Sequence, residues 1–242
     1  MILCIDSGNS RIKYGLWKDD GWLASGAFAH AESAELGRLA ESWPLPERIM
    51  LANVAGPQAE ARIRQGLADW SARLEVVHSS VAACGVVNHY RNPGRLGVDR
   101  WCALIGARSL VPGALLVVMA GTATTIDTLD AAGNFLGGFI LPGQHLMLSA
   151  LARDTAGLPF ADGHHAIWPQ ATEDAIVSGA IEAQVGAIER AWARLPDGKR
   201  HCLLSGGNAA LLAQHLVIPA SQADNLPLLG LKEMARETRR ET

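Results

Sequence analysis

The sequence has no excess of charge of either sign. Its 242 residues carry 21 Lys and Arg against 24 Asp and Glu, which gives a formal net charge of −3 at pH 7. A protein that holds nucleic acid through its phosphates needs a strongly basic surface, so the charge balance disfavours a nucleic-acid partner. The charge balance does not exclude the binding of small anionic ligands, because local backbone dipoles can bind them.

Cysteines and long apolar runs are also scarce. The four cysteines are Cys4, Cys84, Cys102 and Cys202. Their wide spacing indicates neither a zinc knuckle nor a redox pair, so we expect reduced thiols. The longest apolar runs, such as residues 114–120, are far shorter than the ~20 residues that a membrane helix needs. No export signal is visible after Met1. Together these absences predict a cytoplasmic protein without a membrane partner.

The residues that are present indicate a folded protein with a large core. The chain is 49% hydrophobic and 19% charged, which is a globular composition. At about 100–150 residues per domain, the length allows two domains. We expect them at residues 1–112 and 113–242.

A strand, a glycine turn and a second strand occur twice in the sequence. In the first copy the apolar run 2–5 leads into Asp6-Ser7-Gly8-Asn9-Ser10, and in the second copy the run 115–118 leads into residues 120–125. Aligning Asp6 with Met119 places Gly8 on Gly121 and also matches the leucines that follow. The pattern favours a duplicated architecture with two lobes around a cleft, although chance similarity of apolar strands is an alternative.

Between and after these copies, strand and helix patterns alternate, which predicts an α/β protein with a mixed or parallel sheet. Expected helices cover residues 31–43, 57–74, 102–110, 173–195 and 208–215, and expected strands cover residues 48–54, 74–78 and 201–204. Thr172 is in a position to cap the long helix. We expect the charge-rich tail from Lys232 to be frayed and solvated.

Three glycine-rich loops follow apolar strands in this α/β pattern. They are Asp6-Ser7-Gly8-Asn9-Ser10, Gly121-Thr122-Ala123-Thr124-Thr125 and Ser205-Gly206-Gly207-Asn208. Glycine lets backbone amides approach phosphate oxygens, and a nearby carboxylate such as Asp6 can hold a magnesium ion or its waters. Each loop alone is also an ordinary turn. The three together favour a nucleotide site, and neither a P-loop nor a dinucleotide fingerprint is present.

The densest polar stretch is residues 88–101, which leads into an apolar helix. Asp99 and Arg100 lie at the expected start of that helix. One interpretation is structural, because a carboxylate at a helix N-terminus is stabilised by the helix dipole. The other is catalytic: Asp99 would be a general base toward a substrate hydroxyl, Arg100 would bind a substrate carboxylate, and Tyr90 would shape the pocket. The spacing leaves both open.

Taken in order, these motifs resemble those of the type III pantothenate kinases, also called the Bvg accessory factor family. The first glycine loop resembles the first phosphate motif, and Gly121-Thr122-Ala123-Thr124-Thr125 resembles the second. Asn92-Pro93 with residues 96–101 resembles the pantothenate motif. The correspondence continues through residues 137–143, Thr172, residues 205–207 and residues 228–231, so it covers nearly the whole chain.

The resemblance implies a duplicated actin-like ATPase fold, that of the acetate and sugar kinase, Hsp70 and actin superfamily. It also implies a homodimer that uses ATP and magnesium, with a monovalent cation such as K⁺ or NH₄⁺, to phosphorylate pantothenate in the first step of coenzyme A synthesis. By this resemblance Asp99 is the catalytic base, and Tyr90, Gly97, Val98, Asp99 and Arg100 line the pantothenate site, with Thr172 donated from the second subunit. ATP would contact Asp6, Ser7, Gly8, Asn9, Ser10, Arg11, Ile12, Lys13 and Thr122, and Asp6 would face its magnesium.

One position departs from the family pattern. Many members have an aspartate that binds the monovalent cation just before the second phosphate motif, and this chain has Met119 there. A thioether is a poor ligand for a hard cation. Dependence on a monovalent cation is therefore the part of the resemblance that this sequence supports least.

Two other functions compete with this interpretation. A regulatory protein on the same fold would not need Asp6, Asp99 and Arg100, which are all present. A related kinase acting on a sugar or on acetate would not be expected to carry the Asn92-Pro93 and 96–101 segment. Both alternatives are less consistent with the sequence than a pantothenate kinase.

Overall fold

The chain divides into two units, and each is described by itself. The structure is a computed structural model, which describes residues 1–196 and 198–237. Unit 1 consists of Met1–Val111 together with the C-terminal segment from Asn225, and unit 2 consists of Pro112–Asp224. The chain was expected to divide between residues 112 and 113; the boundary lies one residue earlier, and the C-terminal segment belongs to unit 1.

Unit 1 is built on a mixed five-stranded sheet. Its strands are β1 (Ile2–Ser7), β2 (Arg11–Lys18), β3 (Gly21–Ala29), β4 (Arg48–Asn53) and β5 (Leu74–Val76), in the order β3-β2-β1-β4-β5. β1 pairs antiparallel with β2 and parallel with β4. All six residues of β1 are buried, as expected for a central strand covered on both faces. The predicted mixed sheet is confirmed.

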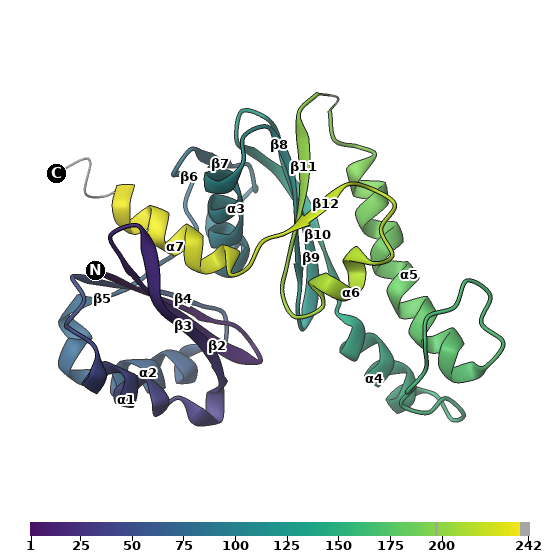
Figure 1. The fold of residues 1–242 in the computed structure, drawn as a ribbon, viewed down its shortest axis with the longest axis horizontal. Helices are drawn as coiled ribbons and strands as arrows, with labels where there is room; N and C mark the ends of the chain where they lie inside the picture. The colour runs from purple at the N-terminus through teal and green to yellow at the C-terminus, as the bar shows by residue number, and fades with distance from the viewer. Residues whose placement is uncertain (197, 238–242) are drawn as a thin grey trace. The chain divides into compact units, whose positions relative to one another are not determined.

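Helices cover both faces of this sheet (Figure 1). Leu36 of α1 (Glu35–Ser42) and Ile63 of α2 (Pro57–Gly66) pack with alternate β1 residues on one face. On the other face, β1 packs with α3 (Val98–Leu110) and α7 (Leu226–Glu237). α1 and α2 are shorter than predicted, because the adjoining segments His30–Glu32 and Ala68–Arg73 adopt 3₁₀ conformation. A hairpin of β6 (Ala82–Ala83) and β7 (Val86–Asn88) also belongs to this unit.

Helix α7 corrects the predicted frayed tail. Residues 232–237 are helical, and Lys232 is buried, with its Nζ 4.6 Å from the centre of the Trp17 ring. The charge-rich composition does not keep this segment in solvent, because the apolar stem of a lysine packs well while its ammonium contacts an aromatic face. The rest of the predicted tail, residues 238–242, lies outside the described residues. Figure 1 shows α7, in yellow, beside α3 from the middle of the chain.

The packing of α7 on α3 requires glycine at two positions. A Cβ at Gly230 would lie 1.9 Å from the Cys102 carbonyl oxygen, and one at Gly106 would lie 2.1 Å from the Leu226 carbonyl oxygen. Real Cβ atoms do not approach backbone so closely, so these glycines set the separation of the two helices.

We expect Gly230→Ala to lower the free energy of unfolding by about 2–4 kcal/mol, although alanine normally favours a helix. The reason is that the new methyl group must push α7 away from α3. Chemical denaturation measures the change. Gly186→Ala is the matched control, because a Cβ at that helical glycine meets nothing within 4 Å and should be neutral or slightly stabilising. Equal stability of the two variants would contradict the prediction.

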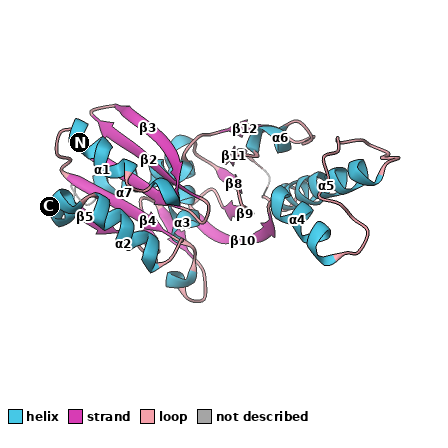
Figure 2. Ribbon diagram, turned by 90° about the horizontal axis from the view of Figure 1, so that it is seen from below, coloured by secondary structure: helices cyan, strands magenta, loops and turns pink. Residues whose placement is uncertain are grey.

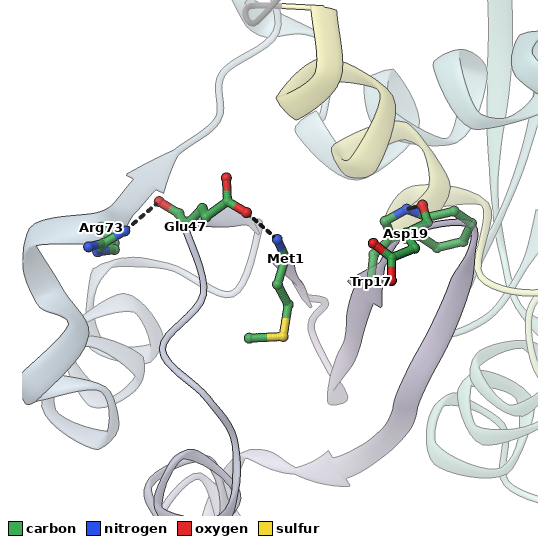
Figure 3. Close-up of polar contacts among 5 residues, drawn as sticks. All are labelled: Met1, Trp17, Asp19, Glu47 and Arg73. Atoms are coloured by element: carbon green, nitrogen blue, oxygen red, sulfur yellow. Dashed lines mark hydrogen bonds and ion pairs between the residues drawn. The ribbon is translucent and has the colours of Figure 1, made fainter.

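The first strand is tied to its surroundings at its start (Figure 3). The Met1 ammonium lies 2.6 Å from Glu47 Oε1, and the Glu47 carbonyl oxygen accepts a hydrogen bond from Arg73. The Trp17 indole N–H donates to the Asp19 carbonyl oxygen where β2 turns into β3. These contacts fix the end of β1 opposite to its glycine loop.

Unit 2 repeats the strand order of unit 1. Its strands are β8 (Ala114–Ala120), β9 (Ala123–Leu129), β10 (Asn134–Pro142), β11 (Arg200–Ser205) and β12 (Ala220–Gln222). β8 pairs antiparallel with β9 and parallel with β11, as β1 pairs with β2 and β4. Within the unit the order β10-β9-β8-β11-β12 therefore matches β3-β2-β1-β4-β5. The duplication predicted from the two glycine hairpins is confirmed.

The helices of unit 2 are α4 (Gln144–Asp154), α5 (Thr172–Trp192) and α6 (Ala209–Ala213). α5 packs its apolar side on β8, and Leu116, Val118 and Ala120 share that core with Ile181 and Ile188. Thr172 was predicted to be the N-cap of this helix, but it is the first helical residue. Ala171 holds the N-cap position and makes no side-chain hydrogen bond there. The long helix was therefore predicted correctly, and its cap was not.

Candidate active site

The first glycine loop begins at the carboxyl end of β1. Asp6 is the last residue but one of that strand, and it pairs in register with Lys13 of β2. The Gly8 amide donates to the Arg11 carbonyl oxygen at 3.1 Å, which closes a tight turn. The Gly8 carbonyl oxygen lies 2.7 Å from His30 Nε2. His30 therefore supports this loop, a role that the sequence pattern did not indicate.

The Asp6 carboxyl group is buried and strained electrostatically. Its pKa is raised from 3.8 to about 7, mainly by burial and then by the Asp99 carboxylate, while Lys13 acts in the opposite direction. Its Oδ1 atom has no hydrogen-bond partner among the described residues. Because an unpartnered buried carboxylate is costly, this group is prepared for a cation or a proton.

Asp99 lies in the first turn of α3, as predicted, and within electrostatic reach of Asp6. A Cβ at Gly97 would lie 2.6 Å from Asp99 Oδ1, so a larger residue there would force the Asp99 carboxylate to move. The Gly97 carbonyl oxygen also accepts the first backbone bond of α3, from Trp101. The glycine thus gives the Asp99 side chain its room at the helix N-terminus.

Arg100, which follows Asp99 in the sequence, contacts Tyr90 in the folded structure. Arg100 is 5% exposed, and its guanidinium donates a hydrogen bond of 3.0 Å to the Tyr90 hydroxyl. A buried guanidinium presents a planar fork of donors that matches a carboxylate. The predicted pocket residues Tyr90, Gly97, Val98, Asp99 and Arg100 all belong to unit 1, and the hydrogen bond between Arg100 and Tyr90 joins the two ends of this segment.

Asn88 organises the loop that carries Tyr90, a role that the sequence pattern does not indicate. Its Nδ2 donates to the carbonyl oxygens of Ser80 and Pro93, and its Oδ1 accepts from the Tyr90 amide. The side chain is buried. Its place at the start of the polar stretch was the one signal that could have indicated it, because a buried amide usually ties loops together.

In unit 2, two glycine loops lie at the same end of the sheet. Gly121 and Thr122 connect β8 to β9, and the Thr122 carbonyl oxygen accepts from the Gly143 amide at 2.9 Å. Gly206 follows β11 with a φ of 98°, and a Cβ there would lie 2.4 Å from the Ala120 carbonyl oxygen. The Asn208 amide donates to the same Ala120 carbonyl oxygen. Backbone segments thus approach one another closely around residue 120.

Thr172 lies elsewhere in unit 2. It lines an open, mostly apolar pocket of about 640 Å³ between α4 and α5, together with residues that include Leu146, Leu151 and Gly179. Thr122 of the second phosphate loop is not among the residues that line this pocket. The structure therefore does not bring these two predicted ligands of unit 2 into one pocket.

A duplicated α/β fold with glycine loops at its strand ends and two adjacent carboxylates is that of an actin-like phosphotransferase. Comparison with known proteins gives the family. The family model described as type III pantothenate kinase matches residues 2–194. The chain belongs to the type III pantothenate kinase family, and it is an enzyme of the phosphotransferase class.

Relatives along the full length agree with this assignment. A type III pantothenate kinase of Dechloromonas aromatica is 60% identical over 235 residues, which cover 97% of this chain and 99% of the relative. One of Aromatoleum aromaticum is 51% identical over 240 residues, with 98% of each chain covered.

Solved structures confirm the predicted fold. A protein of Campylobacter jejuni titled as a Baf family transcriptional activator superposes with a TM-score of 0.63 at 21% identity, and covers 98% of this chain and 99% of its own. A 2-dehydro-3-deoxygalactonokinase structure from Sinorhizobium meliloti gives a TM-score of 0.60 at 19% identity, with 98% of each chain covered. At these identities the likeness concerns the fold alone.

Among the described residues, no helix is both long and apolar enough to span a membrane. The four cysteine thiols are free, and Cys4, Cys102 and Cys202 are buried.

Proposed function

We propose that this chain transfers the γ-phosphoryl group of ATP to the terminal hydroxyl of pantothenate, which is the first step of coenzyme A synthesis. Membership of the family supports the substrate. The observation that carries the chemistry is the pair of carboxylates, Asp6 and Asp99, whose charges interact within unit 1. Two neighbouring carboxylates in different environments suit different tasks, one at a metal ion and one at a proton.

In this proposal Asp99 accepts the proton of the attacking hydroxyl, and Arg100 binds the pantothenate carboxylate. Phosphoryl transfer needs little covalent help from the protein, so positioning and charge neutralisation contribute most of the rate. Tyr90, Gly97 and Val98 complete the substrate site. The hydrogen bond from Arg100 to the Tyr90 hydroxyl would hold the guanidinium in place for the substrate.

Replacing Arg100 tests the substrate assignment. We expect Arg100→Gln to raise KM for pantothenate about 10- to 100-fold, as for the loss of a hydrogen bond to a charged group, with a smaller change in KM for ATP. Steady-state kinetics with each substrate varied in turn measures both values. Arg91→Gln, on an exposed residue of the same segment, is the control. An unchanged KM for pantothenate would remove Arg100 from the carboxylate site.

On unit 1, we assign the loop from Asp6 to Lys13 to the phosphates of ATP, and on unit 2 we assign Thr122 to ATP. Asp6 fits a magnesium ion by its chemistry, because its buried Oδ1 lacks a partner among the described residues and its charge is opposed by Asp99. Mg²⁺ keeps several of its waters and needs only one or two protein carboxylates. When bound, it would neutralise charge that develops on the phosphates.

Met119 stands where the family pattern has the carboxylate that binds the monovalent cation. We propose that turnover does not require K⁺ or NH₄⁺, since a thioether does not replace a carboxylate as a ligand of a hard cation. The assay of the proposed function is therefore run with potassium, ammonium and sodium salts in parallel.

The homodimer is proposed from the surface of α4 and α5, which run beside each other (Figure 2). Leu146 and Leu151 of α4 are exposed there, and they border the apolar pocket that Thr172 and Gly179 also line. Small residues on a helix let a second helix approach closely, and exposed apolar surface favours association. A second copy on this face would receive Thr172 across the interface.

We expect Gly179→Arg to convert the dimer to a monomer and to weaken pantothenate binding. A Cβ at Gly179 meets nothing within 4 Å, so the substitution can start without a clash in the subunit, and the charged end of the arginine would lie in the face proposed for the second copy. Light scattering after gel filtration measures the mass. Gly21→Arg, at a position in unit 1 that is equally open, should leave the mass unchanged. A Gly179→Arg dimer would place the interface elsewhere.

Pantothenate-dependent ATP consumption by the purified protein tests the proposed function. Turnover that requires both substrates supports it, and no turnover from folded protein in any of the three salts would overturn it. A purely regulatory role is not favoured, because the relatives with full coverage carry the name of the enzyme. The cytoplasmic location expected from the sequence stays a prediction.

A further inference from the structure

Two buried hydroxyl groups of unit 2 have no hydrogen-bond partner among the described residues. They are Thr125 Oγ1 on β9 and Ser205 Oγ on β11. Thr125 is 7% exposed and Ser205 is 2% exposed. Buried polar groups are nearly always paired in folded proteins, and leaving one unpaired is unfavourable. Two in one region indicate a ligand that supplies the missing partners.

The strand register places these hydroxyls on either side of Met119. Thr125 pairs with Met119 across the antiparallel β8 and β9, and Ser205 pairs with Met119 across the parallel β8 and β11. Residues opposite each other in a sheet project from the same face. That face is the one opposite to the α5 core, because Val118 and Ala120, the neighbours of Met119, belong to the α5 core.

The same three residues lie at the end of the sheet that carries the glycine loops. Met119 is followed by Ala120 and Gly121, Ser205 directly precedes Gly206, and Thr125 lies near the start of β9. The two loops are packed against each other through the Ala120 carbonyl oxygen. The unpaired hydroxyls are therefore at the base of the glycine loops, within unit 2.

We propose that Thr125 and Ser205 donate hydrogen bonds to the polyphosphate of the bound nucleotide, with Met119 as a neutral floor between them. This inference rests on the proposed function for its nucleotide. Hydroxyl donors suit anionic oxygens, and a thioether between them adds no negative charge to repel a phosphate. A carboxylate at position 119 would oppose the anion unless a cation lay between them.

The spacing favours a phosphate chain over a directly bound cation. Thr125 and Ser205 are on strands that are two sheet spacings apart, about 10 Å. A calcium ion lies roughly 2.3–2.6 Å from each of its oxygen ligands, and a larger monovalent cation only slightly farther, so hydroxyls on strands this far apart do not share one ion. An extended polyphosphate presents several oxygens along its length and meets both.

The experiment compares Thr125→Val and Ser205→Ala with the wild-type protein by calorimetric titration with MgATP and with AMP. We expect each variant to bind MgATP about tenfold more weakly, the usual loss for one hydrogen bond to a charged group, and to bind AMP as the wild type does. The melting temperature without nucleotide should be unchanged or higher, because each substitution removes an unpaired buried hydroxyl.

Thr124→Val is the matched control on the same strand. The Thr124 hydroxyl is also buried, but it donates to Gln184 Oε1 at 2.6 Å on the other face of the sheet. Its loss should lower the melting temperature without nucleotide and should leave the affinity for MgATP within twofold of the wild type. A structural hydroxyl and a ligand-binding hydroxyl thus give opposite patterns in the same two measurements.

Wild-type affinity for MgATP in both Thr125→Val and Ser205→Ala would overturn the inference, as would a melting temperature that falls like that of Thr124→Val. Repeating the titrations in potassium chloride and in choline chloride distinguishes hydroxyls that bind a cation from hydroxyls that bind the polyphosphate. A loss of affinity that is confined to potassium chloride would show that the hydroxyls bind the cation, and would overturn the inference too. If the wild type consumes ATP with pantothenate while these variants bind MgATP normally, the inference alone fails and the proposed function stands.

Discussion

Asparagine in place of Asp99 is expected to lower kcat by about 10²–10⁴, the usual contribution of a general base. The substitution keeps the shape of the side chain at the start of α3 and removes its ability to accept a proton. Because the side chain lies beside Gly97 without a neighbouring Cβ, an amide of the same size fits the space that the carboxylate occupies. KM for ATP should change little.

Single-turnover and steady-state assays with pantothenate measure this loss, and Asp69→Asn serves as a control on an exposed carboxylate of the same unit. The melting temperature of Asp99→Asn should equal or exceed that of the wild type, because the variant no longer opposes the charge of Asp6. Turnover close to the wild-type rate in a folded variant would show that another group accepts the proton.

Asp6→Asn is expected to raise the stability of the protein above neutral pH and to lower its activity. Its pKa of about 7 in the folded protein exceeds the ordinary value of 3.8, so between these two pH values the folded protein binds more protons than the unfolded chain. The free energy of unfolding therefore falls as the pH rises through this window, and above it the loss reaches about 2–4 kcal/mol. Asn at position 6 carries no charge and removes this loss.

Thermal unfolding of both proteins without nucleotide, from pH 4 to pH 8, checks the sign. The wild type should lose more stability than Asp6→Asn as the pH rises, and the variant should be the more stable at pH 8. Turnover with MgATP should fall by at least 10² in the variant, since the carboxylate proposed to face magnesium is gone. Parallel pH curves for the two proteins would mean that Asp6 is ionised without cost.

The sequence predicted the parts of the fold that depend on short stretches of chain. β1 with its glycine loop and β8 with its loop were found because apolar strands and glycine turns are local signals. The start of α3 at Asp99 was found for the same reason. Their duplication followed from the alignment of Gly8 with Gly121, whereas the order of the strands in each sheet did not.

The parts that were missed depend on distant partners. α7 is helical and buried because Gly230 and Lys232 meet Cys102 and Trp17, and neither contact is visible in the C-terminal sequence alone. The supporting roles of His30 and Asn88 arise from loops that come together only after folding. The hydroxyls beside Met119 required the register of β11 on β8, which a single sequence does not determine.

The return of α7 to the first unit has a consequence for the order of events during synthesis. The chain leaves unit 1 at Val111, completes unit 2, and re-enters unit 1 at Asn225. Domains generally fold in the order in which the ribosome releases them. Here the inserted unit is complete while the one that begins the chain still lacks a helix against β1. Until α7 emerges, Cys102 and its apolar neighbours lack the part of their cover that α7 supplies, and a ribosome that stalls before Asn225 would leave this apolar surface exposed to chaperones.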